Sequence, residues 1–314
     1  MTNRRRFIQQ VGAGAALTLL STSAADAQPK PSSKRVLRIA HITDVHILDQ
    51  PEAERLFGQI IREINTAKDK VDFIINTGDT VMDENKQTKE TVEKRWNSWR
   101  KIMDGNRLAV YSALGNHDVW YGPDEASDTE YKKDPRYGKQ WAMEELKMPA
   151  RHYTFQQKNW KFIALDSING ESGYQLDGPQ LEWLGKELSS TPTGVHVCVF
   201  NHVPILSMGA LLYYTKRKPI ADVKFPSGDM HNDHQAIKDV FHKSGNVRLC
   251  LSGHVHYVDA VDYLGVRYLC NGAVSGNWWG KPLTLDEFPP VYTLIDLFED
   301  GSTQHQYVYY KTEA

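Results

Sequence analysis

Apolar and polar residues recur along the first half of the chain with two different spacings, which predict alternating strands and helices. Apolar residues at every third or fourth position predict amphipathic helices over 51–68 and 92–103. Short apolar runs at 36–43, 71–75 and 108–113 predict buried strands before, between and after these helices. Units of this kind build a mostly parallel sheet, so the first half predicts an α/β fold.

The second half contains more predicted strands and fewer predicted helices. The runs 153–156 and 160–165 flank a short turn and predict a hairpin, and helical spacing follows at 179–188 and 232–243. Further strands are expected at 195–200, 247–252, 257–261, 266–270, 291–298 and 304–310, and the last four have no helix between them. Two mixed sheets flanked by helices accommodate this order of elements.

Five short polar segments, most of them directly after a predicted strand, contain the residues best suited to bind metal. The segments are 44–46, 78–79, 115–118, 201–202 and 253–256. Their carboxylate, imidazole and amide groups are donors that borderline and hard divalent ions accept. Seven candidate ligands exceed the four of a closed structural zinc site, so we expect two ions. The candidates are Asp44, His46, Asp79, Asn116, His202, His254 and His256.

Asp79 is the candidate bridge between the two ions. Two-metal hydrolytic sites hold their ions roughly 3.5–4 Å apart, and the short carboxylate of an aspartate suits that spacing. Gly78, Gly115 and Gly253 flank candidate ligands, where a sharp turn has to bring the backbone close to an ion without a Cβ atom in the way. Taken alone, such a segment is more often an ordinary polar turn, and only the combination and order of all five favour a metal centre.

In this order the five segments resemble the calcineurin-like metallophosphoesterases, whose blocks run D-x-H, G-D, G-N-H-[DE], H and G-H-x-H. The resemblance implies a four-layer αββα sandwich of two mixed β-sheets flanked by helices. It implies that the first metal is bound by Asp44, His46, Asp79 and His256, and the second by Asp79, Asn116, His202 and His254. It also implies that His117 is the catalytic histidine rather than a ligand, with Asp118 as a candidate orienting partner.

The same resemblance implies a hydrolase in which metal-bound hydroxide attacks a small phosphate ester and His117 protonates the leaving group. A phosphodiester such as a cyclic nucleotide is favoured over a phosphomonoester. Two alternatives stay open, a non-catalytic, metal-stabilised binding module on the same fold and a nuclease. Met82 stands where purple acid phosphatases carry a ligand tyrosine, so manganese, zinc or ferrous iron is expected rather than ferric iron. The substrate-binding residues are open, with the loop 207–228 and Trp120, Tyr121, Trp278 and Trp279 as candidates.

The amino terminus predicts export. Residues 3–9 resemble a twin-arginine signal, and a mildly apolar run at 11–20 precedes a small-residue cleavage site at Ala25 to Ala27. We therefore expect a signal peptide at 1–27, a linker at 28–35 and a catalytic domain at 36–314. The expected mature protein is periplasmic and is exported by the twin-arginine translocation machinery. We expect no membrane anchor, because the apolar run is too short to span a bilayer and no cysteine near the cleavage site could carry a lipid.

Composition limits the function classes further. The formal charge of −2 would become −4 without residues 1–27, which carry three arginines and one aspartate. The chain therefore lacks the basic character of a nonspecific nucleic-acid binder. Cys198, Cys250 and Cys270 are odd in number and all lie in predicted strands, which favours buried free thiols over disulfides.

Overall fold

A computed structural model describes residues 33–123, 131–169, 173–215, 219–222, 224, 228–280 and 290–310. The predicted signal peptide and the linker up to residue 32 lie outside these described residues. Among the residues that are described, no helix is both long enough and apolar enough to cross a membrane. The three cysteines are buried and free, as predicted.

The first sheet has five strands in the order β13-β12-β1-β2-β3. β1, β2 and β3 run parallel, and their pairing places Ile39 opposite Phe73 and Phe73 opposite Ala109. β12 is antiparallel to β1, and β13 is antiparallel to β12. The bounds are β1 Arg35–Ile42, β2 Phe73–Asn76, β3 Ala109–Ser112, β12 Val291–Phe298 and β13 Thr303–Tyr309. The sheet therefore joins the first parallel units of the chain to its last hairpin.

The second sheet has six strands in the order β10-β11-β9-β8-β5-β4. Its central strands β5, β8, β9 and β11 are parallel, and the edge strands β4 and β10 are antiparallel to their neighbours. The bounds are β4 Tyr153–Gln157, β5 Trp160–Ala164, β8 His196–Phe200, β9 Val247–Ser252, β10 Asp259–Tyr263 and β11 Val266–Cys270. The predicted hairpin is the pair β4 and β5.

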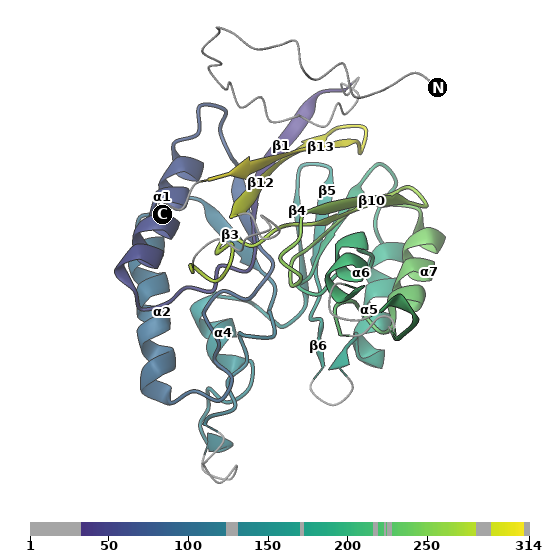
Figure 1. Cartoon of the computed structure of the whole chain (residues 1–314). Coiled ribbons are helices and arrows are strands. Elements are labelled where there is room, and N and C mark those ends of the chain that lie inside the picture. Colours follow the sequence, from purple (N-terminus) through teal and green to yellow (C-terminus); the bar gives the residue numbers. More distant parts are fainter. Residues whose placement is uncertain are drawn as a thin grey trace, which may run out of the picture. The chain divides into compact units, whose positions relative to one another are not determined.

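The two sheets pack face to face between two layers of helices, as Figure 1 shows. Phe73, Ile75, Phe162, Phe200 and Leu251 belong to the apolar core that both sheets share. Helices α1 Pro51–Asn65, α2 Lys89–Met103 and α4 Gln140–Glu145 contribute to a core on the outer face of the first sheet. Helices α5 Gly178–Ser189 and α7 His234–Ser244 do so on the second sheet. The predicted four-layer αββα sandwich is confirmed.

Among the described residues, four short features were not predicted. They are the helix α4 Gln140–Glu145, the ribbon of β6 Ile168–Asn169 and β7 Gly173–Tyr174, the helix α6 Met208–Thr215, and the 3₁₀ helix η2 Ile220–Asp222. Parts of the predicted loop 207–228 lie outside the described residues, and α6 and η2 are the described elements within it.

The fold brings the polar segments together because parallel strands end at a common edge of their sheet. The segments 44–46, 78–79 and 115–118 follow β1, β2 and β3 of the first sheet. The segments 201–202 and 253–256 follow β8 and β9 of the second. Two stacked sheets can therefore present their strand ends to one site.

Candidate metal centre

Five of the seven predicted ligands have a left-handed backbone. The φ angles of Asp44, His46, Asp79, His254 and His256 lie between 44° and 74°. This conformation costs an L-residue roughly 1–2 kcal/mol. Such strain persists where the surrounding structure imposes it, and it concentrates at functional sites. Its coincidence with the predicted ligands indicates a constructed site rather than a set of ordinary turns.

Asp44, His46 and His256 form the first cluster and are all buried. The Nε2 atoms of His46 and His256 are 3.1 Å apart. Asp44 Oδ1 lies 3.3 Å from Nε2 of His256 and 3.8 Å from Nε2 of His46. Ligand atoms that each lie about 2.0–2.2 Å from one ion are separated by about 3 Å or slightly more. The first cluster has this spacing.

Asp79, His202 and His254 form the second cluster. His202 Nε2 lies 3.2 Å from Asp79 Oδ2 and 3.1 Å from Asn116 Oδ1, so the predicted amide ligand joins the same cluster. The structure thus brings together all seven predicted ligands, in the two groups that the family resemblance implies.

The carboxylate of Asp79 lies between the two clusters. Its Oδ2 atom is 3.2 Å from His202 Nε2 and 3.7 Å from His46 Nε2. Its Oδ1 atom accepts the backbone N–H of His117 at 2.8 Å. Because Oδ1 is already held by this hydrogen bond, Oδ2 is the oxygen of Asp79 that faces both clusters.

Hydrogen bonds determine which nitrogen of two imidazoles in the second cluster can bind a metal. A carbonyl oxygen only accepts, so His202 Nδ1–H donates to the Thr77 carbonyl at 2.8 Å and Nε2 is the nitrogen left for a metal. By the same reasoning His254 Nε2–H donates to the Gly228 carbonyl at 3.1 Å, which leaves Nδ1 as its ligand atom. Metal-binding histidines are oriented by such contacts of the other ring nitrogen.

The protonation states suit cation binding. Burial lowers the pKa of His46 to about 3 and the pKa of His254 to about 4, so both rings are neutral at physiological pH. Burial opposes ionisation of Asp44 and Asp79, but His256 and His202 respectively outweigh it and hold both carboxyl pKa values well below the usual range. Burial also opposes protonation of His202, yet the charge of Asp79 raises its pKa to about 9. A cation bound in the second cluster would therefore displace a proton from His202.

Glycines make room for the ligand side chains. A Cβ atom on Gly253 would lie 2.3 Å from Asp44 Oδ2, and one on Gly115 would lie 2.1 Å from Asp79 Oδ1. Gly78 has a φ of 98° and is as tightly packed against the backbone of Gly115. These glycines are therefore needed because ligand side chains and neighbouring backbone pack against them, whereas the predicted approach of the backbone to an ion stays a prediction. The carboxylate, imidazole and amide donors of the two clusters fit a pair of divalent ions.

His117 borders both clusters. Its Nε2 atom is 3.9 Å from Asp79 Oδ2, its ring packs edge-on against His46 at 4.9 Å, and its side chain is 27% exposed. His46, Asp79 and His117 are close enough to hold an ion themselves. The partial exposure is what a residue facing a substrate needs.

The structure corrects the predicted role of Asp118. Its carboxylate is buried and accepts the backbone N–H groups of Thr80 at 2.8 Å and Gly115 at 3.0 Å. Asp118 therefore stabilises the loops after β2 and β3 and does not orient the His117 imidazole. The carboxylate that faces His117 Nδ1 is Asp83, at 3.6 Å. Asp83 was not predicted, although it follows Asp79 by only four residues.

A further segment, 275–279, holds the first cluster and was not predicted in this role. Ser275 Oγ–H donates to the Asp44 carbonyl at 2.8 Å, and Trp279 Nε1–H donates to the Val45 carbonyl at 2.8 Å. The ring of Trp278 lies 4.7 Å from that of His256 and is 37% exposed.

The other aromatic residues differ in whether they lie in the apolar core or near the metal clusters. Trp120 is fully buried in the apolar core, and Tyr121 is 41% exposed. Tyr174, which was not predicted, packs its ring 4.9 Å from that of His254. Burial raises the pKa of Tyr174 to about 12, so its hydroxyl stays neutral and can donate a hydrogen bond.

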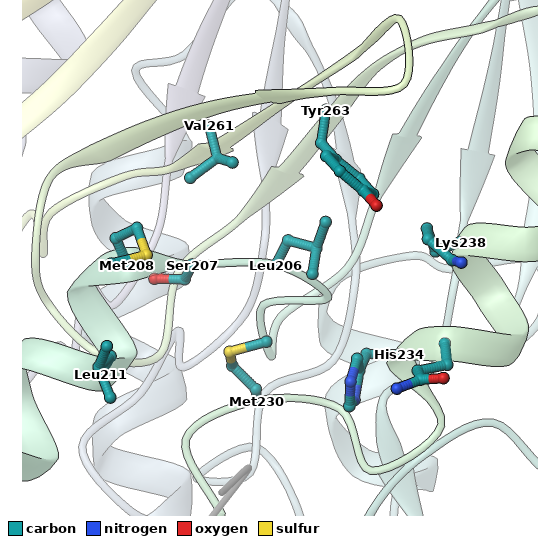
Figure 2. A pocket seen from close by; sticks show the side chains of 10 residues that line it. Leu206, Ser207, Met208, Leu211, Met230, His234, Lys238, Val261 and Tyr263 are labelled. Carbon is teal, nitrogen blue, oxygen red and sulfur yellow. The ribbon is translucent and has the colours of Figure 1, made fainter. Parts of the chain in front are cut away.

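A cavity of about 440 Å³ lies between α6, the start of α7 and β10. Figure 2 shows its mostly apolar lining, which includes Leu206, Met230 and Tyr263, with His234 and Lys238 on the α7 side. None of the predicted ligands lines this cavity, so it is a feature separate from the two clusters.

Comparisons with known proteins agree with the geometry. The family model described as calcineurin-like phosphoesterase matches residues 37–258. A 3′,5′-cyclic-nucleotide phosphodiesterase from Nostoc sp. is 23% identical and aligns over 86% of this chain and 91% of its own. The 3′,5′-cyclic adenosine monophosphate phosphodiesterase of Haemophilus influenzae is 24% identical, over 86% and 89%. A dimetal phosphatase structure from Danio rerio shares the fold, with a TM-score of 0.59, 15% identity, and coverage of 88% of this chain and 100% of its own.

Proposed function

Because the chain belongs to the calcineurin-like phosphoesterase family of metal-dependent hydrolases, we propose that it hydrolyses a phosphodiester of the 3′,5′-cyclic nucleotide class. The substrate class is supported by the names of the Nostoc and Haemophilus relatives, which align with most of this chain. The two-metal mechanism is supported above all by the position of Asp79 Oδ2, which faces both clusters.

Each residue of the centre has a role in this proposal. Asp44, His46 and His256 would hold the first ion, Asn116, His202 and His254 would hold the second, and Asp79 would serve both. Two bound cations would neutralise the charge of the phosphodiester and lower the pKa of water to near neutrality. The chain supplies the fixed geometry, because five of the seven ligands are buried and all seven lie in loops that follow strands of the two packed sheets.

His117 is the proposed proton donor to the leaving oxygen. Its imidazole borders both clusters and is partly exposed, so it can reach the ester oxygen opposite the attacking water. The carboxylate of Asp83 lies 3.6 Å from His117 Nδ1, and we propose it as the group that orients the imidazole.

Two aromatic side chains frame the proposed substrate site. Trp278 flanks the first cluster with an exposed ring, which could stack on a nucleobase. Tyr174 flanks the second cluster, where its neutral hydroxyl could donate to a phosphate or sugar oxygen. We propose these residues as substrate contacts.

The proposal includes a cellular location that rests on the sequence pattern alone. Residues 1–27 would direct export by the twin-arginine route and be removed near Ala27, and the domain 36–314 would act in the periplasm.

A substrate panel tests the function. The purified protein, stripped with a chelator and supplied with Mn²⁺ or left without it, is assayed on cyclic AMP, p-nitrophenyl phosphate and single-stranded DNA. We expect Mn²⁺-dependent release of AMP from cyclic AMP. Turnover of the monoester alone would replace the proposed substrate class, and cleavage of DNA in preference to cyclic AMP would identify a nuclease. Bound metal without turnover of any substrate would favour the binding module.

A further inference from the structure

We infer that Ser167, His231 and Asp233 form a positioning network that holds the imidazoles of His202 and His254 and thereby sets the metal affinity of the second cluster. His231 Nε2 lies 2.8 Å from Ser167 Oγ, and His231 Nδ1 lies 2.9 Å from Asp233 Oδ1. Ser167 and His231 are fully buried. The inference rests on the proposed metal centre and adds the residues that keep one half of it in place.

The donors and acceptors of this network match. The carboxylate of Asp233 only accepts, so His231 carries its proton on Nδ1 and its Nε2 accepts the Ser167 hydroxyl proton. Ser167 Oγ in turn accepts, at 3.4 Å each, the backbone N–H of Val203 and the side-chain amide of Asn201.

The same order of groups activates serine in hydrolases, but here it cannot act on a substrate. A nucleophilic oxygen has to reach the reacting atom, whereas Ser167 is fully buried and its oxygen receives two N–H groups. The network therefore holds loops in place and takes no part in a chemical step.

One end of the network holds the loop that carries His202. Val203 and Asn201, the two neighbours of His202, both contact Ser167. On the other side, the backbone N–H of His231 donates to the Pro204 carbonyl at 2.9 Å. The loop is thus fixed between Ser167 and His231.

The other end holds the surroundings of His254. His231 follows Gly228 by three residues, and the Gly228 carbonyl orients the His254 ring. The backbone N–H of Asn232 donates to the carbonyl of Tyr174, whose ring packs on His254. Asp233 Oδ2 also accepts the backbone N–H of Leu176 at 3.0 Å, which anchors the same segment.

Both imidazoles of the second cluster are therefore tied to one buried histidine. The first cluster is held by other contacts, from Ser275 and Trp279. Loss of the network should affect the second site selectively, and loss of the Ser275 hydroxyl should affect the first.

The test is Mn²⁺ binding by the metal-free protein, measured by calorimetric titration of wild type, Ser167→Ala and Asp233→Asn. Loss of a partner that orients a metal-binding histidine costs about 10–100-fold in metal affinity. We expect a loss of that size at one of two sites in both variants. Ser244→Ala, at the far end of α7, is the matched control that should retain wild-type binding. Asp233→Asn keeps the side-chain volume and serves if Ser167→Ala folds poorly.

Combining Ser167→Ala with the loss of a ligand from either cluster identifies which metal site is weakened. His256→Ala weakens the first cluster, and the Ser167→Ala loss should persist there in full, whereas it should disappear when His254→Ala has already removed the second site. Two ions bound by wild type with unchanged affinities in both network variants, or equal losses at both sites, would overturn the network and leave the proposed function standing. A wild-type protein that binds no Mn²⁺ would overturn both.

Discussion

The neighbouring residues His117 and Asp118 serve different partners, although both come from one polar segment. The His117 ring contacts His46 and approaches Asp79, whereas the Asp118 carboxylate is bound by backbone N–H groups below the site. Besides Asp79, which lies near Nε2, the carboxylate next to Nδ1 of the His117 ring belongs to Asp83. Acid catalysis should therefore depend on Asp83 rather than on a carboxylate at position 118.

His117→Ala should slow hydrolysis of an alkyl or sugar phosphodiester by roughly 10²–10⁴-fold, because an alkoxide needs a proton to leave. A p-nitrophenyl ester should lose much less, since p-nitrophenolate is stable as an anion. Asp83→Asn should show a milder form of the same pattern. The measurement is kcat/KM on matched esters together with metal content. Equal losses on both esters would mean that His117 binds phosphoryl oxygens, and a lost ion would make it a ligand with His46 and Asp79.

Glu84 is a buried acid whose charge state should depend on pH. Its Oε1 accepts Trp96 Nε1–H at 2.8 Å. Burial, together with the charge of Asp118, raises its pKa well above 4.5. The folded protein then holds this proton more tightly than the unfolded chain, so the stability that the protonated form supplies is lost as pH rises from 4.5 through the folded pKa.

Glu84→Gln, which resembles the protonated acid, should match wild-type stability near about pH 5 and exceed it at about pH 8. Urea unfolding of both proteins at both pH values measures the difference. A difference that stays constant across this range would show that Glu84 ionises like an ordinary surface carboxyl group.

The residues that could be predicted from sequence differ in kind from those that could not. The seven ligands lie in short motifs, each next to a strand, so local pattern and order were sufficient to find them. Asp83, Tyr174 and Ser167 act through contacts with residues distant in sequence, and a single serine or tyrosine outside a motif carries no local signal. Asp118 was misassigned because adjacency in sequence does not imply contact between side chains.

At the scale of elements, the tight fit between the loops after β1 and β9 should control the first cluster. An alanine at Gly253 would place its Cβ 2.0 Å from Thr43 Oγ1 and 2.3 Å from Asp44 Oδ2, so one loop has to move. Gly253→Ala should therefore weaken metal binding at the first cluster more than at the second.

The matched control is Gly185→Ala, within α5, where a Cβ atom would meet nothing within 4 Å. That substitution should leave metal binding intact and stabilise the protein by about 0.5–1 kcal/mol, because alanine is the better helix former. Metal titration of both variants measures the affinity of each cluster, and thermal unfolding measures their stability. Unchanged affinity in Gly253→Ala would contradict the close packing of the two loops.

Elements with a clear period were predicted, and elements without one were missed. α1 buries Leu56, Phe57, Ile60, Ile61 and Ile64 on one face, which is the spacing that predicted it. In contrast, α6 (MGALLYYT) is nearly uniform in polarity and so has no helical period. The ribbon β6–β7 has strands of only two residues each, too short for an alternation to be recognised.

At the scale of the whole molecule, the site exists because two sheets stack with their strand ends at one edge. Local pattern predicted an α/β fold with two sheets, and the family resemblance supplied the four-layer arrangement. How loops from both sheets meet depends on packing of the shared core, which hydrophobic periodicity does not encode.

Export is a property of the whole protein, and it should depend on the arginine pair near the amino terminus. Replacing Arg4 and Arg5 by Lys should keep the protein in the cytoplasm, because the arginine pair is recognised by a receptor and not through its charge alone. Cell fractionation with a folded periplasmic control measures this. Normal export of the lysine variant would mean that residues 1–27 are a signal of another type.

The central claim is a two-metal centre joined by Asp79, and the count of bound ions tests it most directly. Elemental analysis after Mn²⁺ loading should find two ions per chain in wild type and in Asp49→Asn, which changes an exposed aspartate close to the site in sequence. Asp79→Ala should lose both ions together, because two divalent cations without the shared carboxylate repel each other across a short gap. An Asp79→Ala protein that retains two ions per chain would contradict the account.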